Sequence, residues 1–180
     1  QWVDPDLGMF DDDFVGCDVS RGMAYCYNGD DYDEGIIGYG DNPPAVGIDF
    51  VTGILADPND SLDNDRDGVV DEAGEQIIMS NFMNYWGSPS IQVDPPQIAP
   101  HFYNYLRSLW LDGSNMTYDG MAGLNQSFPP CKFKFPGTSD LTIGWGLGGT
   151  PVNPVGPPTN FEWSESTAGN TPAETKFIMS

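Results

Sequence analysis

The stretch of sequence that decides the fold is DFVGCDVSRGMAYCY, which occupies residues 13–27. Apolar and polar side chains partly alternate over residues 13–19, and a second run, rich in apolar and aromatic side chains, follows at 23–27. The pair Arg21-Gly22 lies between the two runs and suits a tight turn. Two such runs joined by a short turn that contains glycine predict an antiparallel β-hairpin.

The register of this hairpin decides which cysteines can meet. If Arg21-Gly22 forms a two-residue loop, Cys17 lies directly opposite Cys26. That position permits a disulfide or two adjacent thiols. The odd number of cysteines, with Cys131 as the third, equally favours three buried and unpaired thiols.

Most of the remaining chain predicts short strands and loops. Gly and Pro number 22 and 16, well above average usage, and follow no collagen-like period. Further strands are expected within 45–55 and 75–86, and loops over most of 89–100 and 113–180. One helix is expected at about 100–111, because apolar side chains recur there at helical spacing. These side chains are Phe102, Tyr105, Leu106, Leu109 and Trp110.

The predicted fold is therefore mainly β, a sandwich or jelly-roll-like domain with one short helix and long ordered loops. Residues 1–180 fit a single β-rich domain of ordinary size. The chain is also compatible with being a portion of a longer multidomain protein.

The charge of the chain limits its partners. The net charge is -21, from 27 acidic against six basic residues, and 21 of the acids are Asp. Asp favours turns and oxygen cages around hard cations. Because the chain has no basic patch, nucleic acid and anionic membrane surfaces are not expected as partners. No run of 18 apolar residues is present, so no membrane insertion is expected.

The strongest chemical motif is the acidic stretch DNDRDGVVDE at residues 63–72. Asp63, Asp65 and Asp67 occupy positions 1, 3 and 5 of a tight turn, where their oxygens converge on one point. Gly68 permits the sharp turn, and the carbonyl of Val69 at position 7 extends the arc of oxygens. This spacing predicts a calcium site.

The rest of the cage departs from an EF-hand. Asp71 falls at position 9, but Gly74 stands at position 12, where a bidentate acid is expected. Glu72 and Glu75 are the candidate replacements. We therefore expect a calcium loop in a non-helical setting, and the alternative is a solvated turn rich in Asp.

Other candidate sites have weaker patterns. The acids at 11–13 with Asp18, and those at 30–34 with Asn28, fit either cation sites or charged turns. His101 is the only histidine, so a histidine-rich zinc site is excluded, and no cysteine pair has zinc spacing. A Ser-His-Asp or Cys-His arrangement has no local signature in the chain. No enzymatic activity is therefore expected.

Several ordered motifs resemble a module of large secreted Bacteroidota-type proteins, which often end in a sorting domain for the type IX secretion system. The resemblance spans nearly the whole chain. It rests on residues 2–8, 12–18, 27–30, 42–47, 63–75, 103–110, 135–137 and 166–173. It implies an extracellular or cell-surface protein and supplies no catalytic residues. Asp60-Ser61-Leu62 also resembles the O-glycosylation acceptor of such proteins, which implies a glycan on Ser61.

The sequence thus predicts a non-enzymatic, calcium-binding extracellular module with a structural or adhesive role. Its expected partners are other domains of a parent protein or cell-surface components, and self-assembly is compatible with the sequence. Two alternatives stay open: a carbohydrate-binding accessory domain of a secreted hydrolase, and a subunit of an extracellular fibre.

Overall fold

The structure is a computed structural model. It describes residues 1–9, 11–19, 21–65, 67–86, 94–117, 125–128, 130–136, 164–166 and 168–180. Its strands are β1 (Trp2–Val3), β2 (Asp13–Asp18), β3 (Met23–Asn28), β4 (Tyr32–Asp33), β5 (Gly40–Asp41), β6 (Val46–Asp49), β7 (Phe82–Tyr85) and β8 (Lys176–Met179). The helix α1 spans Ala99–Tyr105.

The predicted hairpin is confirmed as β2 and β3, which pair antiparallel. The predicted two-residue loop is wrong, because Asp18 rather than residue 20 pairs with Met23. The turn is closed by a hydrogen bond of 3.3 Å from the Gly22 amide to the Val19 carbonyl. Gly22 adopts a φ of 64°, which glycine accepts without strain.

This register separates the two hairpin cysteines. Cys17 lies opposite Ala24, and Cys26 lies opposite Val15. Cys17, Cys26 and Cys131 are all buried, and the structure forms no disulfide among these three described residues. Because the register differs from the predicted one by two residues, both hairpin cysteines still face the same side of the sheet.

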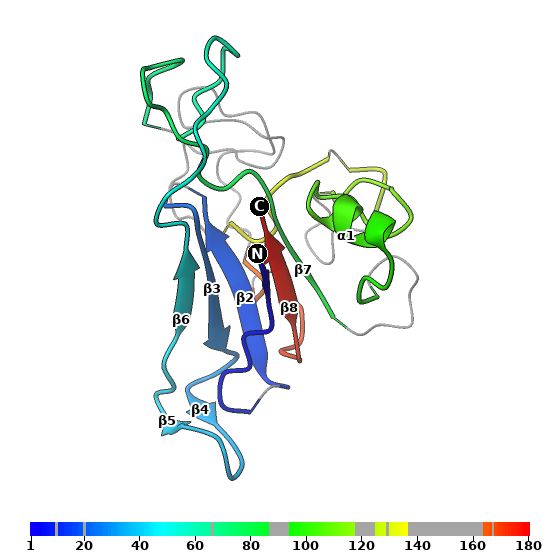
Figure 1. The fold of residues 1–180 in the computed structure, drawn as a ribbon. Coiled ribbons are helices and arrows are strands. Elements are labelled where there is room, and N and C mark those ends of the chain that lie inside the picture. The colour runs from blue at the N-terminus through cyan, green and yellow to red at the C-terminus, as the bar shows by residue number, and fades with distance from the viewer. Residues whose placement is uncertain are drawn as a thin grey trace.

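Two three-stranded antiparallel sheets carry the core. One has the order β2-β3-β6 and the other the order β1-β8-β7, while β4 and β5 form a separate two-stranded ribbon. Figure 1 shows β2, β3 and β6 side by side, with β1, β8 and β7 on the β2 side of that sheet. The N-terminus lies beside the C-terminus in the same view, because β1 pairs with β8.

The two sheets share one hydrophobic cluster and the second sheet has another on its far side. Alternate residues of β2 and β3 pack with Phe82 of β7 and Phe177 of β8. The opposite face of β7 and β8 supplies Met83, Tyr85 and Ile178, which pack with Tyr105 of α1. Both faces of the central β8 are therefore buried, which explains its unbroken apolar run Phe177-Ile178-Met179.

The helix is shorter than predicted. It ends at Tyr105 instead of Leu111, because Ser108 adopts a left-handed φ of 55°. The Leu109 amide then donates to the Asn104 carbonyl at 3.0 Å, and the Ser108 amide to the Tyr105 carbonyl at 3.2 Å. These two bonds form a Schellman ending. Trp110 still reaches the core, but from the loop beyond the helix.

The strands expected within 45–55 and 75–86 are much shorter in the structure. Only β6 and β7 form there, and β8 was not predicted. The mainly β class is confirmed, whereas the sandwich or jelly-roll arrangement stays a prediction. Among the described residues, no helix is long and apolar enough to cross a membrane. Parts of the predicted loops at 89–100 and 113–180 lie outside the described residues.

Candidate metal centre

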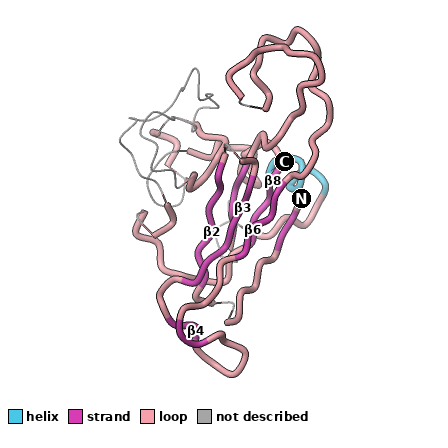
Figure 2. Tube along the Cα trace, turned by 90° about the vertical axis from the view of Figure 1, so that its left-hand side faces the viewer, coloured by secondary structure: helices cyan, strands magenta, loops and turns pink. Residues whose placement is uncertain are grey.

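The acidic loop lies on an arm, residues 50–81, that connects β6 to β7. Figures 1 and 2 show this arm extending beyond one end of the sheets, with the β4–β5 ribbon at the opposite end. The two sides of the arm are joined near its base. The Ala56 amide donates to the Glu75 carbonyl at 2.9 Å, and the Ile77 amide to the Ile54 carbonyl at 2.8 Å.

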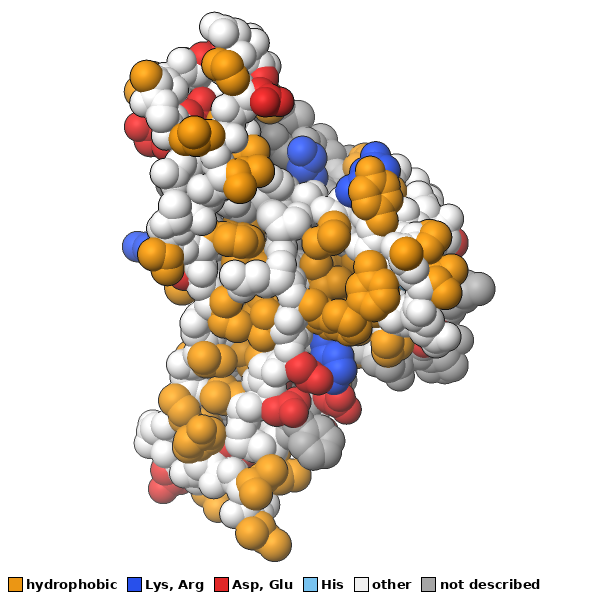
Figure 3. Space-filling model, viewed as in Figure 1, with side chains coloured by type: hydrophobic (Ala, Val, Ile, Leu, Met, Phe, Trp, Pro, Cys, Tyr) orange, Lys and Arg blue, Asp and Glu red, His pale blue; other side chains and the backbone are white. Residues whose placement is uncertain are grey.

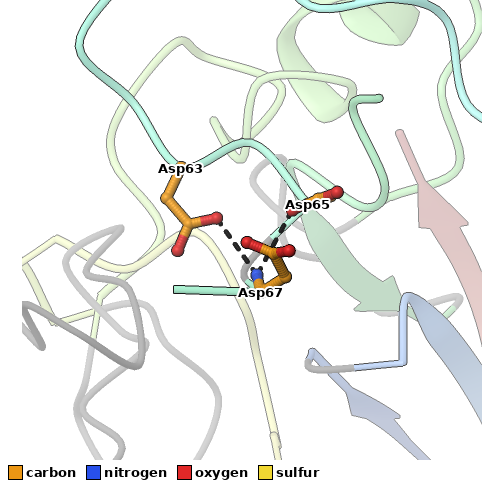
Figure 4. Close-up of side chains that lie close together, drawn as sticks. All are labelled: Asp63, Asp65 and Asp67. Atoms are coloured by element: carbon orange, nitrogen blue, oxygen red, sulfur yellow. Dashed lines mark hydrogen bonds between the residues drawn. The ribbon is translucent and has the colours of Figure 1, made fainter. Parts of the chain in front are cut away.

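Three carboxylates converge at the tip of the first turn. Oxygen atoms of Asp63, Asp65 and Asp67 all lie within 4.8 Å of one another. The Asp67 amide donates to Asp63 Oδ1 at 3.1 Å and to Asp65 Oδ1 at 3.2 Å, as Figure 4 shows. The Gly68 amide donates to Asp63 Oδ2 at 3.0 Å. These bonds fix the turn predicted from the 1, 3, 5 spacing.

A second group of carboxylates shares Asp65 with the first. Oxygen atoms of Asp65, Glu72 and Glu75 also lie within 4.8 Å of one another. The side chain of Glu75 is buried and accepts a hydrogen bond from the Asn64 amide. Glu72 Oε2 is buried and accepts no hydrogen bond from the described part of the chain. Asp65 therefore joins the two turns of the loop.

The remaining two predicted ligands lie differently. Asp71 belongs to neither group, and its two carboxylate oxygens accept from the Ser61 amide at 3.1 and 3.2 Å. The Val69 side chain is half exposed, and its amide donates to Asp67 Oδ1 at 2.8 Å. The structure therefore places five of the seven predicted ligands in these two groups, and Asp71 belongs to neither.

The electrostatics of the loop are repulsive. A hydrogen bond from its own backbone lowers the pKa of Glu72, but desolvation and the charges of Glu75, Asp65 and Asp67 outweigh it and hold that pKa above its ordinary value. The ion pairs of the described residues involve Arg21 with Asp18 and Lys176 with Asp4 and Glu174, and none of these lies on the arm.

This arrangement is suited to a hard cation. Ca²⁺ takes six to eight oxygen ligands in a flexible geometry. Each group of three carboxylates can supply part of this set, and an oxygen that accepts a backbone hydrogen bond keeps a lone pair for a metal. The conformation of the turns thus brings the carboxylate oxygens of each group close to one another.

The two weaker acidic clusters behave as structural groups. Asp33 is buried and accepts from the amides of Met9 and Tyr39 at 3.0 and 2.8 Å. Asp13 is buried and accepts from the Leu7 amide at 3.1 Å. Within the described residues, neither cluster brings three potential ligands together. His101 lies half buried on α1, where its Nδ1 accepts from the Gln97 amide at 3.4 Å.

A polar site around Glu165 was not predicted. This carboxylate is buried and accepts from the Val15 amide at 2.8 Å and from Asn84 Nδ2 at 3.0 Å. Burial raises its pKa above the ordinary value. Val15 and Asn84 lie 150 and 81 residues away, so these contacts could not be predicted from local spacing.

Comparisons with known proteins found no family model, no curated protein and no solved structure that matches this chain. The resemblance to secreted Bacteroidota-type modules therefore stays a prediction.

Proposed function

We propose that this chain is a non-enzymatic, calcium-binding extracellular module with a structural or adhesive role. The observation that carries the proposal is the position of Asp65 within 4.8 Å of both carboxylate groups. A cation bound there contacts the turn of Asp63 and Asp67 as well as the turn of Glu72 and Glu75. It would close the arm on itself.

The mechanism is thermodynamic. A cation that binds the folded loop but not the unfolded chain stabilises the fold by about 2.7 kcal/mol at one hundred times its Kd. It also reduces the repulsion among carboxylates in a chain of net charge -21. Extracellular calcium modules typically have a Kd of about 10⁻⁴ to 10⁻³ M. Extracellular calcium would then fill the site, and chelators would empty it.

A structural or adhesive role is supported by the apolar surface of the same arm. Val51, Ile54 and Leu55 are 94%, 74% and 69% exposed near its base. Figure 3 shows apolar and acidic side chains together on the arm. Exposed apolar groups of this kind favour contact with another surface. The partners we propose are other domains of a parent protein or cell-surface components, with type IX secretion as the export route.

The test is a calcium titration of chelated protein, followed by thermal unfolding. At calcium concentrations one hundred times the Kd, 2.7 kcal/mol corresponds to a rise in Tm of roughly 5–10 °C for a domain of this size, and the rise is about half as large at ten times the Kd. Magnesium is the matched control, because it demands a smaller octahedral site and keeps its waters. No rise in Tm at millimolar calcium, or an equal rise with magnesium, would contradict the proposal.

A further inference from the structure

Two adjacent hollows lie beside the end of β7, away from the arm. The first has a volume of about 280 Å³ and the second of about 290 Å³. Trp86 and Ala173 line both, so the hollows lie on either side of these two residues. Each volume falls just below the usual range of about 300–1,000 Å³ for ligand pockets, so each suits a single small ring.

The first hollow combines one aromatic residue with several hydrogen-bonding side chains. Around Trp86 and Ala173 it is lined by Glu165, Asn170, Thr171 and Thr175. These side chains offer hydroxyl, amide and carboxylate groups, which include both donors and acceptors. Such a lining recognises a ligand that itself carries donors and acceptors at several positions.

Buried hydrogen bonds hold the polar side chains of the first hollow in place. Glu165 is fixed by the Val15 amide, and Asn84 donates to both Glu165 Oε1 at 3.0 Å and Thr175 Oγ1 at 3.3 Å. Asn84 is fully buried, and its Oδ1 accepts no hydrogen bond from any described residue. Preorganised polar groups of this kind bind a ligand with less loss of conformational entropy.

The aromatic residue is also restrained. The ammonium nitrogen of Lys134, itself fully buried, lies 4.7 Å from the centroid of the Trp86 ring and 5.3 Å from that of Trp110. A cation over the ring face holds its orientation. Trp86 is nevertheless only half buried and lines both hollows.

The second hollow differs in charge. In addition to Trp86 and Ala173, it is lined by Pro95, Glu174 and Lys176. Lys176 already pairs with Asp4 and Glu174. The charges of the two lining residues Lys176 and Glu174 cancel, which suits an uncharged ligand.

Other ligand classes fit these walls less well. An anionic ligand would meet Glu165, Glu174 and a chain of net charge -21. A purely apolar ligand would displace water from these polar side chains without replacing its hydrogen bonds, which is unfavourable. A neutral sugar ring offers hydroxyls to the polar side chains and an apolar face of C–H groups to the tryptophan ring.

We propose that the two hollows form a groove for a neutral oligosaccharide, with one sugar ring beside Glu165, the next beside Lys176, and Trp86 between them. The groove shares no residue with the calcium loop of the arm. Either proposal can therefore fail without the other.

The test begins with a glycan array and continues with titration calorimetry. The probes are cellobiose, mannobiose, lactose and chitobiose, each compared with its monosaccharides. Wild type is expected to bind at least one disaccharide more tightly than the corresponding monosaccharide. A monosaccharide bound as tightly as its disaccharide would contradict the two-ring arrangement, and an array without any bound glycan would overturn the proposal.

Blocking variants locate the binding. Thr171 and Ala173 are exposed, so Thr171→Trp and Ala173→Trp should fold and fill the first hollow or both hollows. Each is expected to weaken disaccharide binding at least about tenfold. Thr52→Trp, at an exposed position on the arm, is the matched control and should retain wild-type affinity. Unchanged binding by Ala173→Trp would overturn the proposal.

Discussion

The backbone amide of Val15 donates a hydrogen bond of 2.8 Å to Oε2 of Glu165, 150 residues further along the chain. The other oxygen of Glu165 accepts from Asn84 Nδ2 at 3.0 Å. Val15 belongs to β2 and Asn84 to β7, so one buried carboxylate connects the two three-stranded sheets. The segment around Glu165 is therefore part of the framework that holds the sheets together.

Glu165→Ala should destabilise the fold strongly. The change leaves the Val15 amide without its partner and removes one of the two acceptors of Asn84 Nδ2. A buried donor left unsatisfied costs about 1–3 kcal/mol, so we expect a loss of roughly 2–4 kcal/mol. Urea unfolding at neutral pH measures it.

The matched variant is Glu165→Gln, which keeps one oxygen acceptor and the shape of the side chain. It should lose less stability than the alanine variant. If both variants unfold at the wild-type urea concentration, Glu165 does not connect the sheets.

The β2–β3 hairpin shows which features of the fold the sequence pattern could predict. The alternation of apolar and polar residues correctly located β2 and β3, because successive side chains of a strand point to opposite faces. It could not fix the register, since a shift of two residues leaves every side chain on the same face. The register is set by the turn from Val19 to Gly22, which is closed by a backbone hydrogen bond that the residue pattern does not indicate.

Other features could not be predicted because they depend on contacts between residues far apart in the sequence. The strand β8 has only four residues, and its partners are residues 2–3 and 82–85, so its burial depends on contacts distant in sequence. The acidic turn at 63–68 was locally predictable, because its ligands and its glycine are neighbours. That Asp71 lies outside both carboxylate groups was not predicted, since it depends on how the arm folds back.

Asp65→Asn should weaken calcium binding while stabilising the calcium-free protein. Asp65 lies in both carboxylate groups, so its charge attracts the cation and repels four other acids. Because calcium affinity depends on the number of charged ligands, we expect the Kd to rise at least about tenfold. Calorimetry gives the Kd, and thermal unfolding in chelator gives the change in stability.

Asp71→Asn is the matched control. Asp71 accepts from the Ser61 amide and has a φ of 57°, a conformation that asparagine tolerates. The variant removes the same charge from the same loop and should change the Kd by less than about threefold. A larger loss of affinity in Asp71→Asn than in Asp65→Asn would show that position 9 holds the cation instead.

Asp13 should make stability depend on pH. Desolvation raises the pKa of Asp13 from 3.8 to about 7 in the folded protein, against the opposing bond from Leu7. Between these two values the folded state binds more protons than the unfolded state. The contribution of Asp13 to stability is therefore full below pH 3.8 and is lost as the pH rises toward 7.

Asp13→Asn should remove this dependence, because asparagine keeps an acceptor for the Leu7 amide but has no proton to lose. Relative to wild type, its Tm should rise progressively from pH 4 to pH 7 and then stay level. Asp11→Asn removes one charge at an exposed neighbouring position and separates burial from net charge. A constant Tm difference across this range would contradict the assignment to Asp13.

Gly53→Ala should open the base of the arm without touching the carboxylates. A Cβ added at Gly53 would lie 1.8 Å from the backbone carbonyl oxygen of Ile77, so the two sides of the arm must separate. Overpacking of this kind costs about 1–3 kcal/mol. The movement would also shift Glu75 away from Asp65, because Glu75 pairs with Ala56 beside this contact.

We therefore expect Gly53→Ala to lower both the calcium affinity and the protection of the Ile77 amide from hydrogen exchange. Gly47→Ala is the control, since the nearest atom there is the flexible Met23 sulfur, at 2.9 Å. That side chain can move aside, so affinity and exchange should stay close to wild type. Normal calcium binding in Gly53→Ala, together with fast exchange at Ile77, would show that the cation site forms independently of the base of the arm.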